Sequence, residues 1–354
     1  MPYFSLKSFS LWLAAMACLL AAPARAGITY QQVTVGNAGN AGDTRTGANT
    51  LGKGAVAYDY QIGKYDVTIG QYTAFLNAAD PSGANANGIW NSEMQSNLNI
   101  AGISYTSGAS AGSKYSVIDN GGNSANRPIT FVSWFDAARF ANWMTNGQGA
   151  GSTETGAYNL TTAAPGVAPA KTSGAAFYIP TENEWYKAAY YSPSLNGGTG
   201  GYYAYATQSN TAPGNVVGSL ANQANYKAGG LFSVTQSSAS SSSQNYLTDV
   251  GAFTNSASFY GTFDQSGNVS QWNDLDGVAG SSRGLRGGDW AGDALLLSSS
   301  DSSTLPMSFG GNGGIGFRLA SPAGVPEIDP SGLSAVLGLI VGGLGLLERR
   351  RYGR

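Results

Sequence analysis

The sequence has no histidine and a single cysteine, Cys18, and these two shortages exclude much of enzyme chemistry. Cysteine and histidine are common nucleophiles and bases in covalent catalysis, and they supply the soft and nitrogen ligands of zinc and copper sites. Cys18 lies in the N-terminal lead, so the remainder of the chain can form no internal disulfide. Stability must therefore come from packing, hydrogen bonds or a metal held by oxygen ligands.

Charge is scarce as well, at 11% of the residues. Residues 27–324 hold 12 basic and 17 acidic side chains, a net charge of −5. Because nucleic-acid binding needs a basic surface, we expect no nucleic-acid partner. Glycine is abundant, at 51 of 354 residues, and aromatic residues make up 11% of the chain. This combination is typical of a folded domain with many loops.

The N-terminus has the three parts of a secretory signal peptide. Lys7 precedes an apolar run at residues 11–22, and the small-residue triplet Ala24-Arg25-Ala26 follows. The order predicts cleavage by signal peptidase after residue 26, so that the mature chain begins at Gly27. A buried N-terminal helix is the alternative interpretation.

The C-terminus combines V-P-E-I-D-P at residues 325–330, an apolar stretch at 333–347 and three arginines at 349–351. It resembles a PEP-CTERM-type sorting signal. The apolar stretch is short for a full bilayer span, and the arginines would keep its end in the cytoplasm. The resemblance implies transient membrane retention, processing by an exosortase-like protease, and a final location at the cell envelope, on the cell surface or outside the cell. A permanent membrane anchor is the alternative.

Three segments carry a capping box, in which a Ser or Thr precedes an acid or amide by three residues. The pairs are Thr68 with Gln71, Ser133 with Asp136, and Thr181 with Glu184. Each predicts a short helix. Long polar loops at 147–172 and 237–244 separate short strand-like segments such as 177–179 and 316–319. We therefore expect an α+β fold with extensive irregular structure.

Six sequence blocks occur in an order that identifies a family. They are Y-D-V-T with Q-Y at 65–72, P-I-T-F-V-S-W-F-D-A at 128–137, I-P-T-E-N-E-W at 179–185, G-T-F-D-Q-S-G-N-V-S-Q-W at 261–272, L-R-G-G-D-W at 285–290 and G-F-R-L at 316–319. Together they resemble the sulfatase-modifying factor domain of formylglycine-generating enzymes. The resemblance covers residues 62–320, leaving 27–61 as an N-terminal segment and 321–354 as linker and sorting signal. It implies a loop-rich fold related to the C-type lectin fold.

The family's known chemistry depends on residues that this chain lacks. Formylglycine-generating members bind copper through two cysteines after the R-G-G block, and those positions correspond to Gly292 and Leu297 here. Ergothioneine-type relatives bind iron through histidine. The resemblance thus points to no copper or iron site. A third branch, similar to the pyoverdine-maturation protein, does without these cysteines.

The resemblance also implies structural calcium. The block at 261–272 would offer the Asp264 carboxylate, the carbonyls of Gly267 and Val269 and the Gln271 side chain, and calcium prefers six to eight such oxygens. Gln271 replaces the usual glutamate, which would weaken the site. A second site would begin at Asn225 and Tyr226. The alternative is that Asp264 and Asn268 hold a turn through side-chain to backbone hydrogen bonds.

Other conspicuous residues favour structural roles. The tryptophans at 134, 143, 185 and 272 are expected in the core. Arg286 and Arg318 are expected in buried ion pairs. Acids at positions 274, 276, 289, 293 and 301 fit either a cleft or an exposed loop.

These observations favour an exported, non-catalytic domain that acts as a binding or structural module, with a glycan or matrix component as its ligand. The alternative is a cysteine-independent oxidoreductase acting on an exported peptide or small molecule, for which Asp289 is the weak catalytic candidate. Formylglycine generation itself would need a cysteine from a partner protein.

Overall fold

The computed structural model describes residues 27–47, 49–164, 166–306 and 313–324. The predicted signal peptide and sorting tail lie outside the described residues. Within the described part of the chain, no helix is both long enough and apolar enough to cross a membrane.

Three helices begin where the capping boxes predict them. They are α2 (Ile69–Ala79), α4 (Trp134–Thr145) and α5 (Glu182–Tyr190), and each has both reciprocal hydrogen bonds of its box. The helix predictions are therefore confirmed. The shorter helical segments are α3 (Glu93–Ser96), η1 (Ser124–Asn126) and α6 (Leu195–Gly198).

Two small sheets form the frame of the domain. The first has the order β1-β2-β13 and is antiparallel, with β1 (Gln32–Val35), β2 (Tyr60–Gly63) and β13 (Ala320–Pro322). The second has the order β11-β10-β9-β12, with β11 (Ser303–Pro306), β10 (Ser282–Arg286), β9 (Ser270–Asn273) and β12 (Ile315–Gly316). The segment before residue 62 thus contributes a strand to the first sheet.

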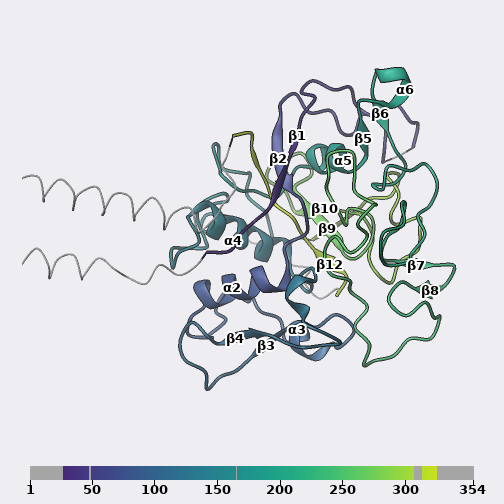
Figure 1. Cartoon of the computed structure of the whole chain (residues 1–354). Coiled ribbons are helices and arrows are strands. Elements are labelled where there is room, and N and C mark those ends of the chain that lie inside the picture. The colour runs from purple at the N-terminus through teal and green to yellow at the C-terminus, as the bar shows by residue number, and fades with distance from the viewer. Residues whose placement is uncertain (1–26, 48, 165, 307–312, 325–354) are drawn as a thin grey trace, which may run out of the picture. The chain divides into compact units, whose positions relative to one another are not determined.

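Three two-stranded hairpins complete the described strands. They are β3 (Ile103–Tyr105) with β4 (Tyr115–Val117), β5 (Tyr191–Ser192) with β6 (Gly201–Tyr202), and β7 (Lys227–Ala228) with β8 (Leu231–Phe232). In Figure 1 the four-stranded sheet lies centrally, with α2 and α4 to one side and the β7–β8 hairpin to the other. Long loops connect these elements, so the expected loop-rich α+β fold is confirmed.

The strand predictions were only partly right. The segment 316–319 is not one strand, because β12 ends at Gly316 and β13 begins at Ala320. Arg318 between them turns into the interior and is fully buried. The segment 177–179 forms a single bridge, from Tyr178 to Ala320, rather than a strand.

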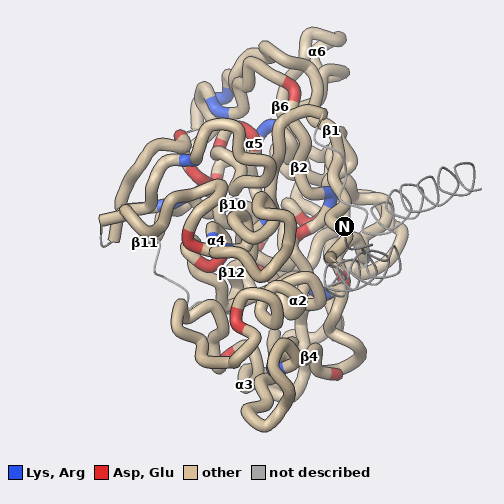
Figure 2. Tube along the Cα trace, turned by 90° about the vertical axis from the view of Figure 1, so that its left-hand side faces the viewer, with Lys and Arg blue, Asp and Glu red and all other residues tan. Residues whose placement is uncertain are grey.

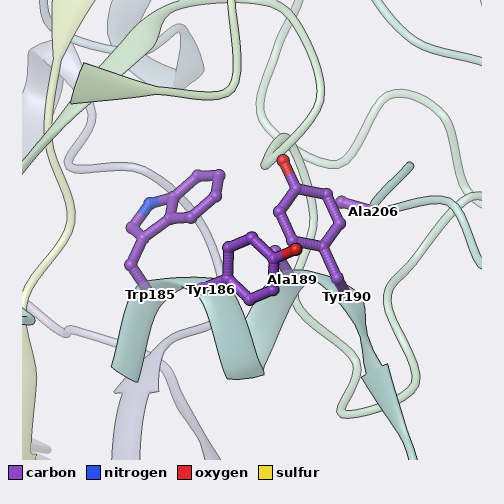
Figure 3. Packing of buried hydrophobic residues seen from close by; sticks show 5 residues of the cluster. All are labelled: Trp185, Tyr186, Ala189, Tyr190 and Ala206. Atoms are coloured by element: carbon purple, nitrogen blue, oxygen red, sulfur yellow. The ribbon is translucent and has the colours of Figure 1, made fainter. Parts of the chain in front are cut away.

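Aromatic side chains fill the core. Tyr72 and Phe75 of α2 contact Phe140 of α4, and Phe317 packs on both Tyr72 and Phe140, with ring centroids 5.4 to 6.5 Å apart. A second cluster lies on α5 and consists of Trp185, Tyr186, Ala189 and Tyr190 packed with Ala206 (Figure 3). The four tryptophans predicted to be core residues are at most 3% exposed. That prediction is confirmed.

We predict that Ser133→Ala lowers the free energy of unfolding by about 1–2 kcal/mol, because it removes the side-chain acceptor for the Asp136 amide at the start of α4. Ser92→Ala is the matched control, since Ser92 precedes α3 without a capping hydrogen bond from its side chain. Urea unfolding of both variants measures the difference. Equal losses would show that the capping box does not stabilise α4.

Candidate functional site

A tight loop follows β10 and carries the L-R-G-G-D-W block. Gly287 and Gly288 have φ angles of +98° and +66°, which favour glycine. A Cβ on Gly288 would lie 2.7 Å from Cδ1 of Leu297. Leu297, at the end of the loop, therefore packs closely against Gly288 at its beginning.

Asp289 holds the next turn of this loop. Its Oδ1 accepts hydrogen bonds from the amides of Ala291 and Gly292, at 3.0 and 2.9 Å. Burial raises the pKa of the Asp289 carboxyl above its usual value, while these two amides act in the opposite direction. The carboxylate also faces Gly314, where a Cβ would lie 2.1 Å from Asp289 Oδ2. The weak catalytic candidate is thus placed as a turn-forming residue.

Beside the turn, three aromatic rings form a stack. The indole of Trp290 lies parallel to the ring of Tyr246, with centroids 5.0 Å apart and an interplanar angle of 5°. Phe232 of β8 contacts both rings, at 4.4 and 5.8 Å. Lys227 Nζ lies 4.5 Å from the Phe232 centroid, a cation–π distance. Tyr246 and Phe232 are buried, whereas Trp290 is partly exposed.

Backbone hydrogen bonds fix the loop against its neighbours. The amide of Trp290 donates to the Asn268 carbonyl, and the amide of Lys227 donates to the Gly292 carbonyl. Beyond this anchor, Leu295 and Leu296 are 73% and 41% exposed. The loop and the β7–β8 hairpin together present a surface with one aromatic ring, apolar side chains and one cation. We call it the Trp290 surface.

Gln271, one of the predicted calcium ligands, is hydrogen-bonded at both ends of its amide. Its Oε1 accepts from Arg318 Nε at 2.7 Å and from Trp185 Nε1 at 2.8 Å. Its Nε2 donates to the Asp264 carbonyl at 2.7 Å. A guanidinium therefore occupies the side of Gln271 that a cation would need.

Three of the other predicted ligand residues also form hydrogen bonds within the protein. The carbonyl of Gly267 accepts from the Val269 amide at 2.9 Å, and the carbonyl of Tyr226 accepts from Asn215 Nδ2 at 3.2 Å. Asn225 Nδ2 donates to Asn268 Oδ1 and to the Tyr246 carbonyl, both at 2.9 Å.

The carboxylate of Asp264 also has a protein partner. Its Oδ2 accepts from the amide of Gly251 at 2.7 Å. Four of the six residues therefore already use an oxygen in a hydrogen bond within the protein: Asp264, Gly267, Tyr226 and Gln271. Calcium at this place stays a prediction. The positive φ angles of Asp264 and Asn268, 59° and 67°, suit the alternative of a turn, although their side chains accept hydrogen bonds from the amides of Gly251 and Thr248 in a separate segment.

Both arginines singled out in the sequence form buried ion pairs, as predicted. Arg286 Nη2 lies 2.7 Å from Glu182, and Arg318 Nη2 lies 2.9 Å from Asp66. The acids after the R-G-G-D-W region do not form one cleft. Asp274 is buried in a pair with Arg283, whereas Asp276 and Asp293 are exposed.

These features define a loop-rich α+β domain whose candidate binding loop follows β10 of the four-stranded sheet. The Sulfatase-modifying factor enzyme 1-like domain matches residues 29–323, and the chain belongs to this family. No curated protein sequence matches the chain.

Solved structures with a similar fold include three that cover most of this chain. Treponema denticola variable protein 1 is 18% identical, with 83% of this chain and 95% of that chain covered and a TM-score of 0.48. CarF is 21% identical, with 85% and 99% covered and a TM-score of 0.48. PvdO from Pseudomonas aeruginosa is 16% identical, with 83% and 92% covered and a TM-score of 0.39.

The residues present do not fit the copper that formylglycine-generating members of the family bind. Gly292 has no side chain, and Leu297 is fully buried in an apolar cluster with Ala224 and Tyr226. The described residues include no group of three or more His, Cys, Asp or Glu side chains placed to hold a metal ion. Neither position can supply a thiolate for copper.

The sequence analysis missed the aromatic stack. Phe232, Tyr246 and Trp290 come from separate parts of the chain and share no periodic pattern. The one available signal was Trp290, which ends the R-G-G-D-W block.

We predict that Gln271→Glu makes the melting temperature depend on calcium. The new carboxylate loses the hydrogen bond to the Asp264 carbonyl and faces that oxygen, so a cation between them becomes favourable. Calcium should raise the melting temperature of the variant over that in EGTA by about 2 °C or more, and leave the wild type unchanged. Gln71→Glu, which keeps the capping box of α2, is the control. Equal calcium shifts in wild type and variant would contradict the arrangement described.

We predict that the wild type loses stability relative to Asp264→Asn as the pH rises from 4 to 7. Burial raises the pKa of Asp264 to about 6, so the folded state holds its proton more tightly than the unfolded chain. The stabilisation is complete below the unfolded pKa and is lost as the pH rises through the folded one. We expect a relative change of about 2 kcal/mol in urea unfolding. Parallel pH profiles would refute this prediction.

Proposed function

We propose that the protein is an exported, non-catalytic member of its family that binds a glycan or matrix component at the cell surface or in the extracellular matrix. The single observation that carries the proposal is the loop after β10. At the family's copper-binding positions it has Gly292 and the buried Leu297, and beside them it displays Trp290 on a rigid aromatic support.

The Trp290 surface suits binding better than catalysis. Stacking on Tyr246 and Phe232 fixes the indole, so little conformational entropy is lost when a ligand contacts its exposed part. Tryptophan offers a large apolar face together with an N–H donor. Lys227, Leu295 and Leu296 would add one charge and apolar contact around it.

The motifs predicted at residues 1–26 and 325–354 support the proposed export. The segment 1–26 would direct secretion and be removed by signal peptidase, and the segment 325–354 would be processed by an exosortase-like protease after transient membrane retention.

The few charges of the described domain support a role that does not involve nucleic acid. In the view of Figure 2, Lys/Arg and Asp/Glu are intermingled along the described part of the trace.

The second candidate is a cysteine-independent oxidoreductase in which Asp289 takes part. It is favoured by the pKa of the Asp289 carboxyl, which partial burial raises above its usual value. The Asp289 carboxylate also accepts hydrogen bonds from the amides of Ala291 and Gly292, and these bonds give it a structural role as a turn-forming group. If this protein's chemistry needs the Asp289 carboxylate, the Asp289→Asn variant should lose turnover. The turn should be kept in that variant, because asparagine retains an acceptor for both amides.

We predict that Trp290→Ala weakens binding to matrix polysaccharide from the native host by about tenfold or more, equivalent to ~1.4 kcal/mol. Trp90→Ala is the matched control, because Trp90 is also partly exposed and packs on two tyrosines, at 5.5 and 6.2 Å, far from the loop in sequence. Quantitative pull-down of the two variants measures the effect. Equal binding by both variants would contradict the proposed role of the Trp290 surface.

A further inference from the structure

A concave site, separate from the Trp290 surface, lies between the loop at residues 41–45 and the β5–β6 hairpin. The cavity has a volume of about 430 Å³ and is lined by residues 41–45 on one side and by Tyr191, Asn196 and residues 199–202 on the other. This volume is within the range of roughly 300–1,000 Å³ that is typical of small-molecule sites. Figure 1 shows β5, β6 and α6 together at one end of the domain, away from the β7–β8 hairpin.

The two walls of the cavity are held together by Tyr202. Its hydroxyl donates to the Ala41 carbonyl at 2.8 Å and accepts from Asn40 Nδ2 at 2.7 Å. Gly42 approaches Gly52 so closely that a Cβ would lie 2.6 Å from the Gly52 carbonyl oxygen. The cavity is therefore pre-formed rather than a gap between independent loops.

The charged residues among those that line the cavity, Asp43 and Arg45, neutralise each other. The Asp43 carboxylate is buried and accepts hydrogen bonds from the Arg45 amide and guanidinium and from the Tyr186 hydroxyl. These donors hold the pKa of Asp43 below its usual value, although burial acts in the opposite direction. A cationic ligand would have to displace those donors, and an anionic ligand would find the charge of Arg45 already matched.

Three hydrogen-bonding groups remain available on exposed or partly exposed residues that line the cavity. The hydroxyl of Thr44, the Oδ1 of Asn196 and Nη1 of Arg45 have no hydrogen-bond partner among the described residues, and the charge of Arg45 is balanced by Asp43. The partly exposed ring of Tyr202 adds aromatic surface and packs on the buried ring of Tyr191, with centroids 5.1 Å apart. Donors, acceptors and aromatic faces without net charge are the chemistry that recognises a polyhydroxyl ring.

We propose that this cavity binds a neutral saccharide unit. The site uses none of the residues of the Trp290 surface, so either proposal can fail while the other stands. Hydroxyl groups of the sugar would exchange hydrogen bonds with Thr44, Asn196 and Arg45 Nη1, and its apolar face would lie against the ring of Tyr202.

The test uses the exported protein and an array of neutral gluco-, manno- and galacto-oligosaccharides, with oligogalacturonate and glucosamine oligomers as acidic and basic comparisons. Thr199→Trp and Thr44→Trp would each fill the cavity from one exposed wall. Thr106→Trp, at an exposed position after β3, is the matched control. Circular dichroism confirms that all three variants fold.

We expect at least one neutral oligosaccharide series to bind the wild type and Thr106→Trp, and both cavity variants to bind it at least tenfold more weakly. The proposal is overturned if no neutral oligosaccharide binds, if only the charged oligomers bind, or if both cavity variants retain full affinity. A loss of matrix binding in Trp290→Ala with neutral oligosaccharide binding intact would separate the two sites.

Discussion

The guanidinium of Arg318 is the interaction on which the frame depends. Arg318 lies between β12 and β13, and so it belongs to the connection between the two sheets. It donates to the Gly63 carbonyl at the end of β2, to Gln271 of β9, to the Phe263 carbonyl and to Asp66. Because a buried charge without partners costs several kcal/mol, these contacts must all form together. The register of both sheets is thereby tied to one side chain.

The two candidate binding regions extend from this frame on short, tightly anchored loops. The loop after β10 turns at Gly287 and Gly288, where side chains would not fit, and its end is buried at Leu297. The cavity beside β6 depends on Tyr202 in the same way. In both regions close backbone packing holds side chains in place, which lowers the entropy lost when a ligand binds.

Local patterns explain what could be predicted from the sequence. A capping box such as Ser133 with Asp136 is a contact within one turn, so its outcome depends little on the remainder of the chain. Burial of Trp185 and ion pairing of Arg286 were also predictable, because large apolar groups and unpaired charges have few favourable alternatives. The strand expected at 316–319 failed because the long-range partners of Arg318 outweigh local strand propensity.

The sequence by itself determined which chemistry is available: oxygen and aromatic groups, without the thiols and imidazoles of copper and iron sites. Only the tertiary structure decided which groups meet. It directs the Gln271 oxygen toward Arg318, and it stacks Trp290 on Tyr246. The physical reason is that composition limits the ligands a chain can offer. Their orientation depends on hydrogen bonds and packing between segments far apart in the sequence, which no local pattern encodes.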